Sequence, residues 1–167
     1  MKFVQIQDTV GKTYDAFMKM ESLSADVKIS ETETVNVSVG TDLSTLIEIN
    51  PIYFDLDKAI IRPDAMIELD KIVKIMNQNP TMVIELGSHT DCRASKSYNM
   101  KLSDRRAKAS AAYIKKRIVG GSRIYGKGYG ESMLKNGCAC EGTVVSTCTE
   151  EEHQLNRRTE FVIKKFN

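Results

Sequence analysis

An acid and a base stand fifteen residues apart in the segment ELGSHTDCRASKSYNMKLSDRRA, residues 85–107. Asp91 follows His89 and Thr90 after an apolar run, and Arg106 comes later in a segment typical of a helix. A carboxylate can bind an ammonium group, and a guanidinium can bind a carboxylate with bidentate geometry. The two residues together could therefore hold a small zwitterion. In the simpler alternative, Asp91 caps the helix and Arg106 forms a surface ion pair worth about 0–1 kcal/mol.

The expected helix carries a polar face that includes the base. Asn99, Ser103 and Arg106 stand at positions i, i+4 and i+7, which places them on one side of a helix with 3.6 residues per turn. A helix that packs on a core normally presents apolar residues there. Asp91 precedes this helix in the loop after an expected strand, and such loops often carry ligand-binding residues. On spacing alone, a binding site and the simpler alternative are equally open.

Strands and helices alternate from residue 49 onward. The apolar patterns predict strands and helices in chain order at residues 49–57 (strand), 62–77 (helix, with Pro63 in its first turn), 81–87 (strand), 97–118 (helix), 122–131 (strand) and 158–165 (strand). A long cysteine-bearing loop separates the last two strands. Right-handed crossovers would pack both helices on one face of a small mixed sheet. We therefore expect an α+β domain with the order βαβαββ.

Residues 1–48 differ in composition from the rest of the chain. They contain four lysines and eight acidic residues, whereas residues 49–167 contain twenty basic and fourteen acidic residues, a net charge of +6. A short helix is expected over residues 12–23 and a pair of strands over residues 25–39. We expect an N-terminal leader, or the tail of a preceding module, over residues 1–48, with a domain boundary near residues 41–48.

The basic character of the C-terminal part does not by itself identify a partner. The positive charge is spread along the chain without a nucleic-acid-binding motif, so nucleic acid is not expected as a partner. No apolar run approaches the ~20 residues that a membrane-spanning helix needs. The first residues lack the pattern of a secretory signal, which predicts either a cytosolic protein or a piece of a longer exported one.

The cysteines suggest two chemical alternatives. Cys138, Cys140 and Cys148 fall in one polar loop, and Cys92 directly follows the central acid. An even number of cysteines in such a loop favours disulfides and an oxidising compartment. The alternative is zinc, which the three loop cysteines and His153 could bind. The C-x-C spacing is tighter than in most zinc sites, which favours the disulfides.

Four blocks of the sequence resemble the signature blocks of one family. They are NPIYFDLDKAIIRPDA, GSHTDCRASKSYNMKLSDRRAKASAAYI, RIYGKGYGE and NRRTEFVI, and the resemblance covers residues 49–167. This region is similar to the C-terminal domain of outer membrane protein A, the OmpA-like peptidoglycan-binding family, which includes peptidoglycan-associated lipoprotein and flagellar stator domains. The resemblance implies a βαβαββ domain that binds the peptide stem of peptidoglycan non-covalently, usually through diaminopimelate.

The resemblance also implies roles for individual residues. Asp91 and Arg106 match the paired acid and base of the family, which would hold the ammonium and the carboxylate of the free centre of diaminopimelate. Asn99 matches an asparagine that contacts the ligand. Asp57 matches a polar position on the rim of the pocket.

Two arginines stand immediately before the last expected strand. Arg158 resembles a supporting basic residue of the family site, and Arg157 is the weaker candidate. Thr90, in the TD pair, completes the expected ligand-binding residues. Arg105 is expected to be a solvated surface residue. His89 has no convincing serine or cysteine nucleophile beside it, so we expect it to orient a neighbour or to pack.

The loop after the TD pair differs from the small residue and glycine that are common in the family. Here it reads Cys92-Arg93-Ala94-Ser95. The similarity to Bacteroidetes-type members, in CxC followed by CTEEEHQLNRR, implies that two disulfides tie the long loop together and pin it to the binding loop. The preferred pairing among the three possible ones is Cys92 with Cys140 and Cys138 with Cys148.

The sequence thus predicts a non-enzymatic, cofactor-free anchor that ties a larger envelope protein to the cell wall. The expected location is the periplasmic face of the outer membrane, and the expected partner is peptidoglycan. Two other classes stay open. One is a protein–protein interaction module that binds an acidic partner, and the other is a lytic or metal-dependent wall hydrolase that uses His89, Asp91 and the cysteines.

Overall fold

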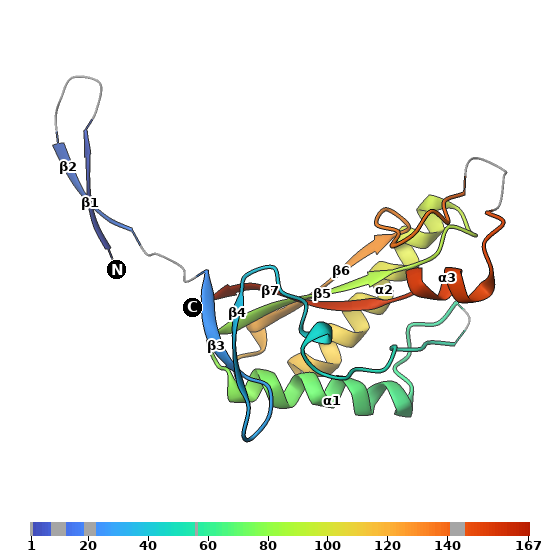
Figure 1. Cartoon of the computed structure of the whole chain (residues 1–167), viewed down its shortest axis with the longest axis horizontal. Coiled ribbons are helices and arrows are strands. Elements are labelled where there is room, and N and C mark those ends of the chain that lie inside the picture. Colours follow the sequence, from blue (N-terminus) through green and yellow to red (C-terminus); the bar gives the residue numbers. More distant parts are fainter. Residues whose placement is uncertain (1, 8–12, 19–22, 56, 141–145) are drawn as a thin grey trace.

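A three-stranded sheet and the helices beside it organise the molecule (Figure 1). The computed structural model describes residues 2–7, 13–18, 23–55, 57–140 and 146–167, and for residues 2–18 it describes the backbone alone. In chain order the strands, α-helices and 3-10 helices (η) are β1 Lys2–Gln7, β2 Thr13–Met18, β3 Ser24–Lys28, β4 Thr34–Ser38, η1 Leu43–Thr45, α1 Pro63–Gln78, β5 Met82–His89, α2 Lys96–Lys115, η2 Gly121–Arg123, β6 Ile124–Gly130, α3 Glu150–Asn156 and β7 Thr159–Phe166.

β5 is the central strand of the sheet, whose order is β6-β5-β7. It pairs in parallel with β6, with Ile84 opposite Ile124, and antiparallel with β7, with Leu86 opposite Phe161. All the residues of β5 are buried, so this strand is covered on both faces as well as at both edges. The expected mixed sheet is confirmed, and so is an antiparallel last strand.

α1 forms over the segment in which helical periodicity predicts it. Pro63 occupies the first turn, where a missing N–H removes no helical hydrogen bond. Leu69, Ile72 and Met76 recur on one face and are fully buried. Burial of each such side chain contributes about 1.5–3 kcal/mol. This apolar face holds α1 against the core that it shares with the sheet.

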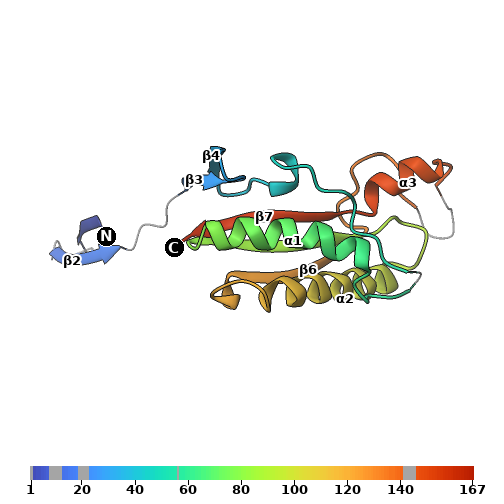
Figure 2. The same ribbon diagram turned by 90° about the horizontal axis from the view of Figure 1, so that it is seen from below.

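α2 lies so close to β6 that two positions of the strand need glycine. A Cβ atom on Gly126 would lie 2.3 Å from the carbonyl oxygen of Ala107, and one on Gly128 would lie 2.2 Å from the backbone nitrogen of Asp104. The close contact places the first turns of α2 beside the carboxyl ends of β5 and β6. α1 and α2 lie on the same side of the sheet, as expected (Figure 2).

None of the described helices is both long and apolar enough to cross a membrane.

The strand expected over residues 49–57 is wrong. The described residues of this segment run as irregular chain between η1 and α1. Pro51 has no N–H to donate to a sheet, and Asp57 has a φ of 55°, outside the extended region. Ile52 is nevertheless buried in the core. The apolar pattern of this segment therefore reflects packing of an irregular chain.

The N-terminal part contains two antiparallel hairpins. β3 pairs with β4, which confirms the pair of strands expected over residues 25–39. β1 pairs with β2, so the helix expected over residues 12–23 is wrong for residues 13–18. Residues 12 and 19–22 lie outside the described residues. The segment TYDAFM alternates in polarity over most of its length, and the strand partner satisfies its backbone groups.

Residues 24–48 pack on the same core as the sheet and α1. Three of their side chains are buried there: Val27, Val37 and Leu43. The N–H of Gly40 donates to the carbonyl of Ile163 at 2.8 Å, and the N–H of Ile163 donates to the carbonyl of Thr41 at 2.9 Å. A boundary at residues 41–48 would therefore cut through packed structure. Composition does not reveal this, because backbone hydrogen bonds leave no mark on residue type.

α3 lies within the segment expected to be a long loop. The Thr149 hydroxyl accepts the N–H of Glu152, and the Glu152 carboxylate accepts the N–H of Thr149 at 2.8 Å. This reciprocal capping box is visible in the sequence TEEE. A helix of seven residues has too little apolar periodicity to predict it, however, so its stability must come from capping and tertiary contacts.

Candidate functional site

A cavity of about 610 Å³ opens where the carboxyl end of β5 meets the start of α2. The irregular segment before α1 and the connection from α3 to β7 complete its walls. All six residues expected to bind a ligand line this cavity: Asp57, Thr90, Asp91, Asn99, Arg106 and Arg158. The structure thus brings together residues that are far apart in the sequence.

The Asp91 carboxylate is buried and already has cationic partners. Its Oδ2 accepts hydrogen bonds from Nη2 of Arg93 at 2.7 Å and from Nη1 of Arg157 at 2.6 Å. Its Oδ1 accepts the backbone N–H of Arg93 at 3.2 Å. Burial alone would raise the pKa of Asp91, but the hydrogen bonds from the two arginines outweigh it and lower the pKa. The carboxylate is therefore ionised at neutral pH and fixed in direction.

Glu150, the first residue of α3, bridges the same two arginines. Its Oε2 lies 2.6 Å from Nη1 of Arg93, and its Oε1 lies 2.5 Å from Nη2 of Arg157. The hydrogen bond from Arg93 is the largest cause of a lowered pKa at Glu150. The side chain of Glu150 is 61% exposed, whereas that of Asp91 is 11% exposed. Two arginines therefore link one buried and one exposed carboxylate in a four-residue charge cluster.

The Arg106 guanidinium is half-buried and is held by backbone carbonyls. Its Nε donates to the carbonyl of Lys58 at 3.0 Å, and its Nη2 donates to the carbonyl of Asp55 at 3.2 Å. The guanidinium also lies over the Phe54 ring, 5.0 Å from its centroid. Burial is the largest cause of a lowered pKa at Arg106. Among the described residues, no carboxylate lies within ion-pair distance of this guanidinium.

Asn99 and Ser103 support the site from the same helical face. Asn99 is buried, and its Nδ2 donates to the carbonyl of Asp91 at 3.0 Å and to the carboxylate of Glu131 at 2.5 Å. Ser103 is fully buried, and its Oγ accepts the N–H of Gly130 at 2.9 Å. Asn99 lines the cavity, but Ser103 does not. The polar face of α2 thus joins the helix to the two strand ends.

The Asp57 side chain is held by the first half of α2. Its Oδ1 accepts the hydroxyl of Tyr98 at 2.8 Å and Nη2 of Arg105 at 3.0 Å. Arg105 is half-exposed, as expected of a surface residue, but it forms an ion pair with the rim of the site. These contacts tie the irregular segment to α2.

The two arginines before β7 contact different acids. Arg157, the weaker candidate, contacts Asp91 directly, whereas Nε of Arg158 donates to Glu160 at 2.8 Å. Both arginines line the cavity. Thr90 is buried, and its hydroxyl has no hydrogen-bond partner among the described residues.

His89 packs against an aromatic ring. Its ring stacks on Tyr129 with centroids 5.0 Å apart. Nε2 lies 3.3 Å from Glu160, without hydrogen-bond geometry. Burial, followed by the positive charge of Arg158, lowers the pKa of His89 to about 4. His89 is therefore neutral at pH 7, and these contacts agree with the expected packing role.

All four cysteines form disulfides. Cys92 pairs with Cys140, 48 residues away, and Cys138 pairs with Cys148, 10 residues away. This is the pairing expected from the family resemblance. The first disulfide joins the residue after Asp91 to the cysteine-rich loop.

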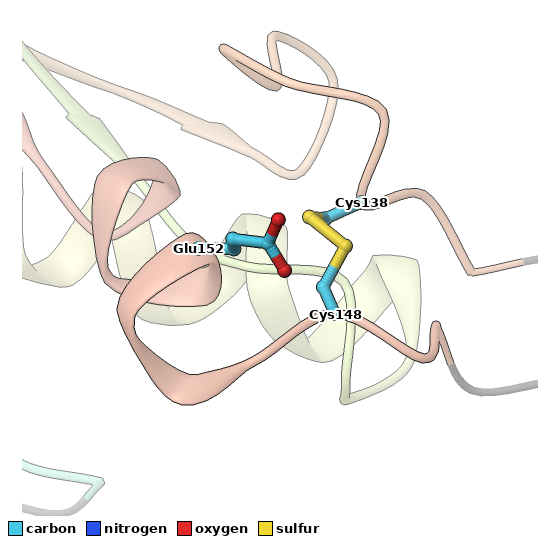
Figure 3. A group of neighbouring side chains, drawn as sticks. All are labelled: Cys138, Cys148 and Glu152. Carbon is cyan, nitrogen blue, oxygen red and sulfur yellow. A yellow bond between two sulfur atoms is a disulfide. The ribbon is translucent and has the colours of Figure 1, made fainter.

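The three loop cysteines that the zinc alternative requires are all in disulfides, so none of them is a thiolate. Figure 3 shows the Cys138–Cys148 disulfide beside Glu152. The two sulfurs and one carboxylate oxygen of Glu152 all lie within 4.8 Å of one another. Only a thiolate binds metal well, and these sulfurs are bonded to each other. Glu152 also caps α3. The same pairing removes the cysteines from the hydrolase alternative.

Comparison with known proteins identifies relatives of this chain. The model of the OmpA family matches residues 53–144. Outer membrane porin F of Pseudomonas fluorescens is 35% identical over 107 residues, which cover 64% of this chain and 30% of that protein. Peptidoglycan-associated lipoprotein of Pseudomonas putida is 33% identical over 112 residues, which cover 67% of this chain and 61% of that protein. The chain spans less than two thirds of either relative.

Solved structures share the fold. The peptidoglycan-associated lipoprotein from Burkholderia pseudomallei has a TM-score of 0.54 at 22% identity, with 67% of this chain and 87% of that chain covered. The cell wall anchor of the T6SS from Pseudomonas aeruginosa has a TM-score of 0.55 at 20% identity, with 67% and 74% covered. These structures confirm the α+β class. The relatives are a porin and peptidoglycan-associated lipoproteins by name, which agrees with the non-enzymatic class expected of this chain. Because the family model matches more than half of its residues, this chain belongs to the OmpA family.

Proposed function

We propose that this chain binds peptidoglycan non-covalently and anchors a larger envelope protein to the cell wall, at the periplasmic face of the outer membrane. The relatives support this proposal by name, since they include peptidoglycan-associated lipoproteins and a cell wall anchor. The disulfides support an oxidising compartment such as the periplasm.

The proposed ligand group is the free amino-acid centre of diaminopimelate in the stem peptide. Oδ1 of Asp91 accepts only one described hydrogen bond, from the Arg93 N–H, so it keeps acceptor capacity for an ammonium group. Arg106 has no carboxylate partner among the described residues and would bind the carboxylate of the same centre. The hydroxyl of Thr90, which has no hydrogen-bond partner within the described part of the chain, can add a further hydrogen bond.

One observation carries the proposal. A buried, ionised acid and an arginine that has no carboxylate partner in the described part of the chain line the same cavity of about 610 Å³. An acid and a base held apart in one cavity complement a zwitterion better than they complement a simple anion or cation. Phe54, Asn99 and the charge cluster hold both groups in place before a ligand arrives, which limits the entropy lost on binding.

Sedimentation of the purified protein with peptidoglycan sacculi tests the proposal. Each charge-assisted hydrogen bond contributes about 1.5–3 kcal/mol, which corresponds to about 10- to 100-fold in affinity. Asp91→Asn and Arg106→Gln should each weaken binding by at least about tenfold. Asp70→Asn and Arg117→Gln are matched controls, because these residues lie outside the cavity lining, and they should bind as the parent does.

A competition experiment tests the ligand group itself. Free diaminopimelate should displace the parent protein from sacculi, whereas its diamide, which keeps the ammonium groups but has no carboxylate, should not. Sedimentation of both site variants as strongly as the parent would contradict the anchor function. Equal competition by the amino acid and the diamide would contradict the role of Arg106.

A further inference from the structure

Arg93 and Arg157 converge on a carboxylate that belongs to the protein itself. Each of the two oxygens of Glu150 accepts a short hydrogen bond from a different guanidinium, at 2.6 and 2.5 Å. Guanidinium groups arranged around the two oxygens of one carboxylate are the usual protein device for binding this group. All three residues line the cavity. The arrangement is therefore a formed carboxylate site within the pocket.

The Glu150 carboxylate can be displaced from this site at little cost in stability. Its side chain is 61% exposed, and it begins a helix of only seven residues. Exposed ion pairs contribute little to stability, because water and side-chain entropy compensate for most of the attraction. A competing carboxylate can therefore replace Glu150 without disrupting the core.

The two arginines would keep their positions after Glu150 is displaced, because both are bound to Asp91. Asp91, which is 11% exposed, accepts Nε and Nη2 of Arg93 and Nη1 of Arg157. Oε1 of Gln154 also accepts Nε of Arg157 at 3.0 Å. Asp91 and Gln154 together hold the two guanidiniums independently of Glu150. Nη1 of Arg93 and Nη2 of Arg157, the atoms bound to Glu150, would then point at an available position in the cavity. The cluster is thus preorganised for a second anion.

We propose that Arg93 and Arg157 form a second carboxylate subsite, which Glu150 occupies in the free protein and which a ligand carboxylate outside the zwitterionic centre takes over. This inference rests on the proposed function and specifies its ligand further. The chain selects stem peptides that carry an additional free carboxylate over peptides in which that group is an amide. Glu150 acts as an internal competitor that sets the strength of this selection.

Calorimetric titration with two synthetic stem tripeptides, L-alanyl-γ-D-glutamyl-diaminopimelate in both cases, tests the subsite. In one peptide all carboxylates are free, and in the other every carboxylate outside the free centre of diaminopimelate is an amide. The measured quantity is the affinity for the free-acid peptide divided by the affinity for the amidated peptide. A loss of affinity that is common to both peptides cancels in this ratio. The parent should prefer the free-acid peptide.

Three variants then separate the roles. Glu150→Gln removes the internal competitor and should increase the ratio by about tenfold, the range of a charge-assisted hydrogen bond. Arg93→Gln should bring the ratio close to one. Glu151→Gln removes an equally charged, exposed neighbour on the same helix and should leave the ratio of the parent unchanged within about twofold.

The possible failures are distinguishable. A ratio near one in the parent and in Glu150→Gln, with both peptides still bound through Asp91, would overturn the subsite and leave the proposed function intact. An equal increase in Glu150→Gln and Glu151→Gln would also overturn it, because the effect would then be general electrostatics. Failure of both peptides to bind the parent would overturn the proposed function, and the subsite with it.

Discussion

Asp91 and Arg106 line the same cavity, but different kinds of structure hold them in place. Asp91 follows a fully buried strand, precedes a disulfide-bonded cysteine and is linked through two arginines to Glu150. Arg106 extends from α2 to an irregular segment and binds the carbonyls of Asp55 and Lys58. The acidic end, around Asp91, is therefore crosslinked by covalent and ionic contacts. The basic end, around Arg106, depends on backbone carbonyls and one aromatic ring.

The carboxylate at the acidic end and the guanidinium at the basic end need different contacts to stay charged and in position. A buried carboxylate must be fixed by several donors to stay ionised, and this also fixes its direction. An arginine remains charged in almost any environment, so the basic end needs only a surface that keeps the side chain extended into the cavity. Perturbations of the acidic end should therefore affect both stability and binding, whereas those of the basic end should be smaller and local.

Removal of the Cys92–Cys140 disulfide should have the largest effect. In the chain-entropy description, a crosslink over 48 residues stabilises by about 4 kcal/mol, and one over 10 residues by about 3 kcal/mol. The double variant Cys92→Ser, Cys140→Ser should lower the free energy of unfolding in urea by about 4 kcal/mol. It should also weaken sedimentation with sacculi, because Cys92 adjoins Asp91.

The second disulfide provides the matched control. The double variant Cys138→Ser, Cys148→Ser should lower the free energy of unfolding by about 3 kcal/mol. Its binding to sacculi should stay within about threefold of that of the parent, because neither cysteine adjoins the carboxylate. Equal losses of binding in the two double variants would mean that the covalent link at Cys92 does not hold the acidic end.

His89 should make stability depend on pH at the acidic end. Its pKa is about 4 in the folded protein, mainly because its side chain is only 1% exposed, whereas an unfolded histidine titrates near 6.5. Between pH 6.5 and 4 the unfolded chain therefore binds a proton that the folded protein does not. Stability is thus lost as pH falls through this window, by about 2 kcal/mol between pH 7 and 4.5.

Two acids near His89 titrate in a different window. The pKa of Asp91 is lowered, and that of Glu160 is lowered to about 2. For both, burial opposes the hydrogen bonds from arginines and the other cationic partners that stabilise the charge. Their contributions to the free energy of unfolding are fully present above the pKa of an unfolded carboxyl group, about 4. They are lost only as the pH falls further, towards the lower pKa of the folded state. Urea unfolding at pH 7, 5.5 and 4.5 therefore isolates the histidine.

His89→Gln should remove most of the loss in the free energy of unfolding between pH 7 and 4.5. His153→Gln is the matched control and should keep this loss. If the parent and His89→Gln lose the same free energy of unfolding over this range, His89 is not the source of the pH dependence.

The elements with a regular apolar period could be predicted from the sequence. α1 repeats apolar residues with the period of a helix, because it buries one side. β5 is an apolar run of strand length, which agrees with its burial along its whole length. Residues 49–57 also bury apolar side chains, such as Ile52, but Pro51 and the left-handed backbone of Asp57 keep the segment irregular. A short apolar run does not distinguish a strand from irregular chain that packs on the same core.

Spacing and family resemblance together indicate six residues that line one cavity, but they do not indicate the charge cluster beside them. The contacts of Arg93 with Glu150, and of Arg157 with Asp91, join residues 57 and 66 positions apart. Such pairs depend on where α3 packs, and neither spacing nor composition contains that information. The segment TEEE, with its capping box, is the one local signal that could have placed Glu150 at a helix start.

Asp57 should give the smallest effect, at the basic end. Its φ of 55° is unfavourable for most residues with a Cβ atom, although aspartate tolerates it better than alanine does. Asp57→Ala and Asp57→Gly both lose the contacts with Tyr98 and Arg105, but only glycine adopts this backbone conformation freely. The glycine variant should therefore be more stable to urea than the alanine variant by about 1 kcal/mol. Equal stabilities would mean that the segment relaxes to another conformation, and the carbonyls that bind Arg106 would then not be fixed by Asp57.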